Sequence, residues 1–173
     1  DVFIGSAKME KSGLFLQQPN GTFRRIPSPA LDMDSTYEDV DACWTDVNKD
    51  GFPDLLVASG GNEYFGNSEY LEPRVYLNDC KGGLTRKADA FSGINVTTSC
   101  ILPYDFNGDG FVDLFVGARA VPSEYGKQPK SYLLQNDGTG KFKDVTTQHA
   151  GELSNAGFIT AAIWFDIDKD GDK

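Results

Sequence analysis

The same acidic loop pattern occurs three times in the sequence, and this repetition is what most limits the folds open to the chain. The second copy has Asp105, Asn107, Asp109 and Asp113 at loop positions 1, 3, 5 and 9. Gly110, at position 6, allows the sharp turn that returns the chain. Oxygen-bearing side chains on alternate residues can surround one small sphere. This arrangement suits a hard divalent cation, and Ca²⁺ tolerates its irregular geometry better than Mg²⁺ does.

The other two copies keep the same spacing of acidic residues. The first runs from Asp46 to Asp54, and the third begins at Asp166 and continues through Asp168 and Asp170. The third copy stops at position 8, so we expect two complete cation sites and a truncated third.

An EF-hand is the obvious alternative, and the sequence argues against it. An EF-hand requires a bidentate glutamate at position 12 and helices on both sides of the loop. Position 12 is Val57 in the first copy and Val116 in the second, and short apolar runs follow both loops. Such runs, rich in Val, Leu and Phe, are typical of strands. The loops are therefore expected to join two strands.

The spacing of the loops indicates a repeat protein. Asp105 follows Asp46 by 59 residues, and Asp166 follows Asp105 by 61. A fixed period is the signature of repeat architectures. Each unit continues into a linker and a hairpin whose turn is rich in Asn, Asp and Gly, at residues 13–23, 74–84 and 131–142. Four strands per unit make one blade of a β-propeller.

We therefore predict an all-β fold: a partial β-propeller with about three four-stranded blades and an acidic loop in the first hairpin of each. The whole of residues 1–173 forms one repeat region, with approximate units 1–53, 54–112 and 113–173. Pro103 lies in the strand before the second loop, which is compatible with an edge strand. Residues 158–165 are almost continuously apolar. Their β-branched and aromatic content favours a strand, although periodicity alone leaves a helix open.

At the level of motifs, the chain resembles the FG-GAP/VCBS repeats, the calcium-bearing blades of integrin α-like β-propellers. The resemblance rests on the Asp-x-Asx-x-Asp-Gly-x-x-Asp loops, each followed by an apolar strand and a small residue. Residues 131–138, 141–146 and 161–168 are also similar to bacterial proteins of the ASPIC/UnbV, or CRTAC-like, type. The resemblance covers nearly the whole chain.

The resemblance implies a set of calcium ligands. In the first two loops they are side-chain oxygens at four positions and a main-chain carbonyl at position 7, and in the third loop three carboxylates. The implied ligands are Asp46, Asn48, Asp50, Phe52 and Asp54; Asp105, Asn107, Asp109, Phe111 and Asp113; and Asp166, Asp168 and Asp170.

The same resemblance implies a calcium-binding module outside the cell, secreted or on the cell surface, most readily in a bacterium. Its ligand would be a protein or a carbohydrate, as in adhesion. Linkers 59–73 and 119–130, which carry Tyr64 and Tyr125, are the candidate ligand-binding loops; the alternative is that they are ordinary surface loops whose tyrosines pack on their neighbours. The alternative is a non-catalytic propeller portion of a larger exported enzyme that acts on polysaccharide.

No enzymatic activity is expected of these residues themselves. His149 is the only histidine, and a general base needs positioned partners. Nucleophile-elbow and zinc-protease motifs do not occur. The acidic run that contains Asp32, Asp34, Glu38, Asp39 and Asp41 is expected to be solvated. Three cysteines, Cys43, Cys80 and Cys100, allow one disulfide and a spare thiol, although buried free thiols at Cys43 and Cys100 are the simpler interpretation.

The charge of the chain fits this interpretation. A net charge of −10 excludes attraction to a nucleic-acid backbone, and nine of the 26 acidic residues occupy positions 1, 3, 5 or 9 of the loops. No segment is suited to membrane insertion. Because Asp1 matches position 9 of a loop and Lys173 matches position 8, we expect a fragment whose partners include further blades of the same chain. Its terminal apolar faces should make it aggregate or oligomerise.

Overall fold

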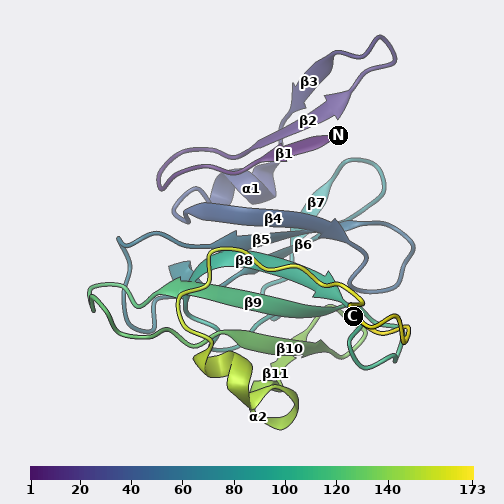
Figure 1. Cartoon of the computed structure of the whole chain (residues 1–173). Coiled ribbons are helices and arrows are strands. Elements are labelled where there is room, and N and C mark those ends of the chain that lie inside the picture. Colours follow the sequence, from purple (N-terminus) through teal and green to yellow (C-terminus); the bar gives the residue numbers. More distant parts are fainter.

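The computed structural model describes residues 1–173 and contains three antiparallel sheets that lie side by side in chain order (Figure 1). The first sheet has strands β1 (Val2–Ile4), β2 (Gly13–Gln17) and β3 (Phe23–Ile26). The second has β4 (Asp39–Thr45), β5 (Asp54–Ser59), β6 (Arg74–Asn78) and β7 (Leu84–Arg86). The third has β8 (Thr97–Tyr104), β9 (Asp113–Ala120), β10 (Tyr132–Asn136) and β11 (Phe142–Asp144). The prediction of an all-β fold is confirmed.

Helices are short and lie in the connections. They are α1 (Pro29–Met33), α2 (Thr146–His149) and two 3₁₀ helices, η1 (Glu69–Leu71) and η2 (Gly151–Asn155). His149, the only histidine, is the last residue of α2. None of these helices has the length and apolar character needed to cross a membrane.

The strand pairing follows the predicted repeat. The three predicted hairpins form as β2–β3, β6–β7 and β10–β11. The first two acidic loops join β4 to β5 and β8 to β9, so strands and not helices flank them. Pro103 lies in β8, an edge strand of the third sheet, where a missing N–H costs no ladder hydrogen bond.

The sheets begin one strand earlier than the predicted units. The second sheet spans residues 39–86 and the third spans residues 97–144. Units divided at 53/54 and 112/113 would separate β4 from β5 and β8 from β9. These two pairs are hydrogen-bonded ladders, and the acidic loop is the connection inside each hairpin.

The core lies between neighbouring sheets. Fourteen buried residues, among them Leu56, Val75, Leu114 and Leu134, fill the space between the second and third sheets. A smaller cluster of five joins the first sheet to the second, and it consists of Leu14 on β2, Leu31 on α1, and Leu55, Val57 and Tyr76 of the second sheet. Strands β5 and β9 are buried on both faces. The first and third sheets cover β5, whereas the second sheet and the segment around Ile159 cover β9. This explains their unbroken apolar sequences.

The predicted strand at residues 158–165 is wrong for this structure. The segment is extended and packs on the third sheet, but it joins no ladder. In the second and third sheets the first strand pairs with the strand that follows the acidic loop. Residues 1–173 contain no such strand after the third loop. The first sheet shows the converse, because it has three strands and none precedes β1.

The acidic run was expected to be solvated, and this is also wrong. The Asp39 side chain is only 4% exposed and pairs with Arg74, while Asp34 pairs with Arg86. Asp41 accepts a hydrogen bond from the Ile101 N–H at 2.9 Å. These carboxylates hold the sheets together.

Candidate metal sites and ligand surface

The three acidic loops have the same backbone conformation. The residue at position 4 is left-handed in each, with φ of 62°, 73° and 63° at Lys49, Gly108 and Lys169. The glycine at position 6 has φ of 91°, 85° and 102° at Gly51, Gly110 and Gly171. Glycine adopts such angles without the steric cost that a β-carbon carries. The repeated sequence pattern is therefore a repeated local structure.

Hydrogen bonds within each loop orient the first carboxylate. The N–H of the position 6 glycine donates to Asp46 Oδ2 at 2.8 Å, to Asp105 Oδ2 at 2.8 Å and to Asp166 Oδ2 at 3.1 Å. The position 5 carboxylates of Asp50 and Asp109 accept from the N–H of the residue two further on, at 2.9 and 2.8 Å. Main-chain N–H groups of each loop therefore hold in place the carboxylates that the resemblance assigns to the cation.

Asp54 and Asp113, at position 9, connect each loop to its sheet. Asp54 accepts the Val47 N–H at 3.0 Å with Oδ2 and the Asn78 N–H at 2.9 Å with Oδ1. Asp113 makes the equivalent pair of bonds. Both residues are fully buried, and burial raises the pKa of each carboxyl. A carboxylate oxygen has a second lone pair, so these bonds are compatible with metal coordination.

The third loop brings its three carboxylates closest together. One oxygen each from Asp166, Asp168 and Asp170 lies within 4.8 Å of the others. The pKa of the neighbouring Asp172 carboxyl is raised, and the charge of Asp170 is the largest cause. An all-oxygen set of this kind fits a hard cation such as Ca²⁺, whose positive charge offsets the repulsion.

The position 7 phenylalanines place their rings differently. Phe52 is 41% exposed and lines a cavity between the first and second sheets. The Phe111 ring lies 4.7 Å from the ammonium group of Lys49, so the first two loops are neighbours. The predicted role of their main-chain carbonyls as ligands stays a prediction.

The two predicted binding linkers follow β5 and β9, at the end of the sheets away from the first two loops. They border two adjoining hollows of about 720 and 510 Å³ that share Asn62 and Ala120. Tyr125 is fully exposed in the larger hollow. Tyr64 instead packs on Tyr70, with ring centroids 4.7 Å apart, and its hydroxyl donates to the Thr36 carbonyl. Only Tyr125 of the two is free to meet a ligand.

A buried charged cluster between the first two sheets was missed by sequence reasoning. The Arg74 guanidinium lies 4.3 Å from the Tyr37 ring and donates to the Tyr76 hydroxyl, which donates in turn to Asp34. Burial is the main cause that raises the pKa of Tyr76, so it stays protonated. Arginine within an apolar strand was the available signal, since such a charge needs a buried partner.

All three cysteines are free. Cys100 is buried, Cys43 is partly buried and Cys80 is exposed in the β6–β7 turn. The simpler interpretation of Cys43 and Cys100 as unpaired thiols agrees with this arrangement.

Sheets of this topology, repeated with an acidic loop inside the first hairpin, define an all-β repeat protein. The FG-GAP-like repeat family matches residues 46–116 and 105–173, which together make up more than half of the chain. The chain belongs to this family of repeats. Neither the curated proteins nor the solved structures contain a significant match to it.

Proposed function

We propose that the chain is part of a calcium-stabilised β-propeller that acts outside the cell as a binding module, in which each sheet is a blade. The observation that carries this proposal is that all three acidic loops share one geometry. In each, the residues at positions 4 and 6 are left-handed, and the N–H of the position 6 glycine donates to the position 1 carboxylate. The ligands are those implied by the resemblance. The bound ion is structural, because it fixes the turn between the first two strands of each blade.

Electrostatics supports this role for the ion. Three bound Ca²⁺ ions would change the net charge from −10 to −4. Without a cation the carboxylates of one loop repel each other, and this repulsion favours opening of the loop. Low affinity, on the order of 10⁻⁴ to 10⁻³ M, is typical of extracellular calcium modules and fits a location where calcium is plentiful.

Calcium binding is tested by calorimetric titration and thermal unfolding of chelator-treated protein. We expect Ca²⁺ to raise the melting temperature, and Asp109→Ala to reduce both the heat of binding and this increase. Asp89→Ala is the matched control, because Asp89 is a surface carboxylate outside the loops. Identical melting curves in calcium and in excess chelator would falsify the proposal.

The ligand surface is the pair of hollows beside the two linkers. Tyr125 supplies an aromatic face, and Arg119, Thr97 and Thr160 supply polar groups in the adjoining hollow. Aromatic rings beside hydroxyl and guanidinium groups suit the faces and hydroxyls of sugars, and they also suit a polar protein surface.

A glycan array probed in the presence of calcium tests this surface. We expect binding that Tyr125→Ala reduces at least tenfold and that Met33→Ala, an exposed apolar side chain on α1, leaves unchanged. A bound glycan unaffected by both Tyr125→Ala and Arg119→Ala would place the ligand elsewhere.

A further inference from the structure

The first two acidic loops contact each other, although they belong to different sheets. The Lys49 ammonium group, at position 4 of the first loop, lies 4.7 Å from the centre of the Phe111 ring, at position 7 of the second. A β-carbon added at Gly110 would come within 2.8 Å of Lys49 Nζ, so this side chain lies directly on the turn of the second loop. The two implied calcium sites are therefore neighbours across the boundary between the second and third sheets.

Val47, at position 2 of the first loop, fixes that loop to the third sheet. Its side chain is 1% exposed and belongs to the core between the second and third sheets. Its Cγ2 lies 2.8 Å from the place that a β-carbon of Gly140 would take, in the turn between β10 and β11. The first loop therefore closes against a turn that belongs to the sheet of the second loop.

Asn136, the last residue of β10, joins the two loops by hydrogen bonds. Its Nδ2 donates to the Val47 carbonyl at 2.8 Å and to the carbonyl of Val112, at position 8 of the second loop, at 3.0 Å. Its main-chain N–H donates to Asp113 Oδ1 at 2.8 Å. One side chain that is only 2% exposed thus holds main-chain atoms of both loops.

The Asn136 amide has no hydrogen-bonding group to spare. Its Oδ1 accepts the Gly138 N–H at 3.0 Å and the Gly140 N–H at 3.1 Å, and Nδ2 uses both of its hydrogens. A buried donor left without a partner is costly. If the first loop opens, the Val47 carbonyl leaves Asn136, and the residue that positions the second loop loses one of its restraints.

These bonds form a path from position 9 of one loop to position 9 of the other. Asp54 Oδ2 accepts the Val47 N–H at 3.0 Å, the Val47 carbonyl accepts from Asn136, and the Asn136 N–H donates to Asp113. Asp54 and Asp113 are fully buried, and both are implied calcium ligands. Ordering of one loop therefore restrains a ligand of the other.

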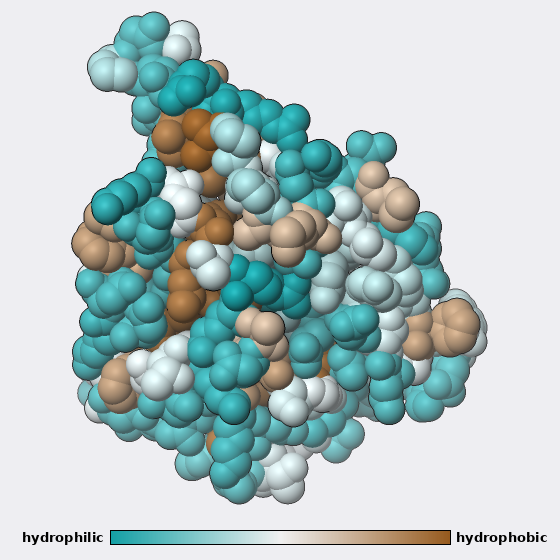
Figure 2. Space-filling model, turned by 180° about the vertical axis from the view of Figure 1, so that it is seen from behind, coloured by the Kyte–Doolittle hydropathy of each residue, from teal (hydrophilic) through white to brown (hydrophobic).

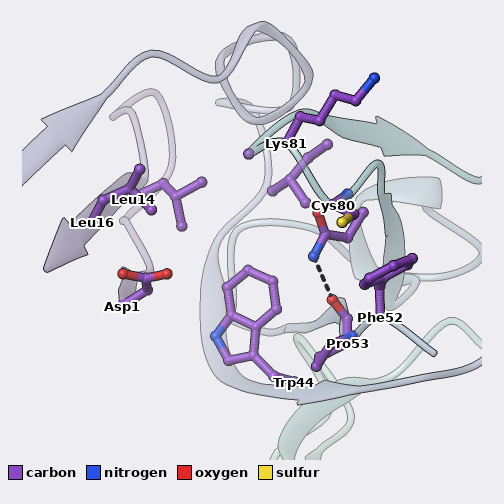
Figure 3. A pocket seen from close by; sticks show the side chains of 11 residues that line it. Asp1, Leu14, Leu16, Trp44, Phe52, Pro53, Cys80 and Lys81 are labelled. Carbon is purple, nitrogen blue, oxygen red and sulfur yellow. Dashed lines mark hydrogen bonds between the residues drawn. The ribbon is translucent and has the colours of Figure 1, made fainter.

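Asn78, the equivalent residue of the second sheet, makes no such link. Its Nδ2 donates to the carbonyl of Pro53, at position 8 of the first loop, at 2.9 Å, and to no second loop. A cavity of about 530 Å³ lies beside it, with Pro53 and Trp44 in its wall (Figure 3). Figure 2 shows apolar side chains gathered below the protruding first sheet. Asn78 is therefore an internal reference for Asn136.

We propose that the first two loops bind calcium as a coupled pair, in which an ion in either loop raises the affinity of the other, and that Asn136 is the positioning residue that carries the coupling. This inference rests on the calcium binding proposed above. Repulsion between carboxylates favours opening of each empty loop. The first ion bound already orders Val47 and Asn136, so the second ion binds to a loop that is partly ordered. The effect is reciprocal by thermodynamic linkage.

Charge does not reverse the expected sign. Each of these loops has three carboxylates among positions 1, 5 and 9, so one Ca²⁺ leaves +2 − 3 = −1 at the site. The carboxylates therefore shield the two ions from each other. The Lys49 ammonium group opposes a cation in the second loop, but its side chain is exposed, and solvent and salt screen this charge.

Calorimetric titration with Ca²⁺ measures the coupling in three proteins. All carry Asp170→Ala, which removes a ligand of the third loop. The first has no other change, the second also has Asp50→Ala and keeps only the second loop, and the third also has Asp109→Ala and keeps only the first. The coupling factor is the product of both binding constants of the first protein divided by the product of the two single-loop constants. We expect about ten, within the roughly 5–150 that is typical of coupled sites.

Asn136→Asp, introduced into all three proteins, tests the residue that carries the coupling. The variant keeps the Oδ1 acceptor for Gly138 and Gly140 but loses the donor to the Val47 carbonyl, so the coupling should disappear. Asn78→Asp is the matched control: any effect should be confined to the affinity of the first loop, with the coupling factor unchanged. If thermal unfolding shows that Asn136→Asp does not fold, Val47→Ala loosens the same contact from the first loop and should also lower the factor.

The outcomes separate this inference from the proposed function. Calcium binding that is independent at the two loops overturns the coupling and leaves the calcium-binding module in place. No heat of calcium binding in any of the proteins overturns both. Coupling that persists in folded Asn136→Asp, or in Val47→Ala where that variant replaces it, overturns the role of Asn136.

Discussion

The Arg74 guanidinium forms an ion pair with the Asp39 carboxylate, and the side chains are only 2% and 4% exposed. Arg74 belongs to β6, and Asp39 begins β4 and also accepts the Ser6 N–H from the connection after β1. The pair therefore joins the first sheet to the second. A charge in so dry a place is tolerated only while its partner and hydrogen bonds remain.

Removing one partner of this pair should be strongly destabilising. We expect Asp39→Ala to lower the free energy of unfolding by about 3–5 kcal/mol, because it leaves the guanidinium buried and unpaired. Urea unfolding monitored by tryptophan fluorescence measures this loss. The exposed pair of Lys11 and Asp32 is the control, and Asp32→Ala should cost less than about 1 kcal/mol. Equal losses at the two positions would contradict the buried role.

The loop glycines should not tolerate a side chain. Gly110 has φ of 85°, and Gly110→Ala places a β-carbon in a left-handed conformation at a cost of about 1–2 kcal/mol. Gly151, in η2, has no positive φ, and open space surrounds the position that a β-carbon would take, so Gly151→Ala should be neutral or slightly stabilising. Thermal unfolding of the two variants measures the difference. A Gly110→Ala protein as stable as Gly151→Ala would show that the turn is not constrained.

The three thiols should differ in reactivity. Burial, with the charge of Asp41 as a smaller cause, raises the pKa of Cys43 to about 12, so its thiolate is scarce at pH 8. Burial is also the main cause that raises the pKa of Cys100. Because the thiolate is the reactive form, iodoacetamide should modify Cys80 first. Peptide mass spectrometry over time gives the order, and early labelling of Cys43 would show that its strand opens.

Stability at acidic pH should depend on Asp144. Burial alone would raise the pKa of this carboxyl, but Lys130 and Thr146 donate hydrogen bonds that lower it below the ordinary 3.8. A lowered pKa in the folded state means a contribution that is present at neutral pH and is lost as the pH falls through the folded-state pKa. Asp144→Asn should therefore destabilise the protein at pH 7 and have little effect near pH 2. Melting curves of both proteins across this range test the sign.

Local patterns predicted the loops and hairpins well. Asp, Asn and Gly at fixed spacing impose a turn whatever surrounds it, so the three acidic loops and the β2–β3, β6–β7 and β10–β11 hairpins could be located from residues alone. The apolar runs that begin at Leu55 and Leu114 likewise indicated strands, and these are β5 and β9.

What the sequence by itself determined is therefore the repeat, the loop conformation and the strand content. Only the tertiary structure decided where each sheet begins and ends, that Asp39 pairs with Arg74 and that residues 158–165 stay unpaired. The physical reason is range. A turn is set by the dihedral preferences of a few neighbouring residues, whereas an ion pair across 35 residues or the edge of a strand depends on which distant segment folds beside it.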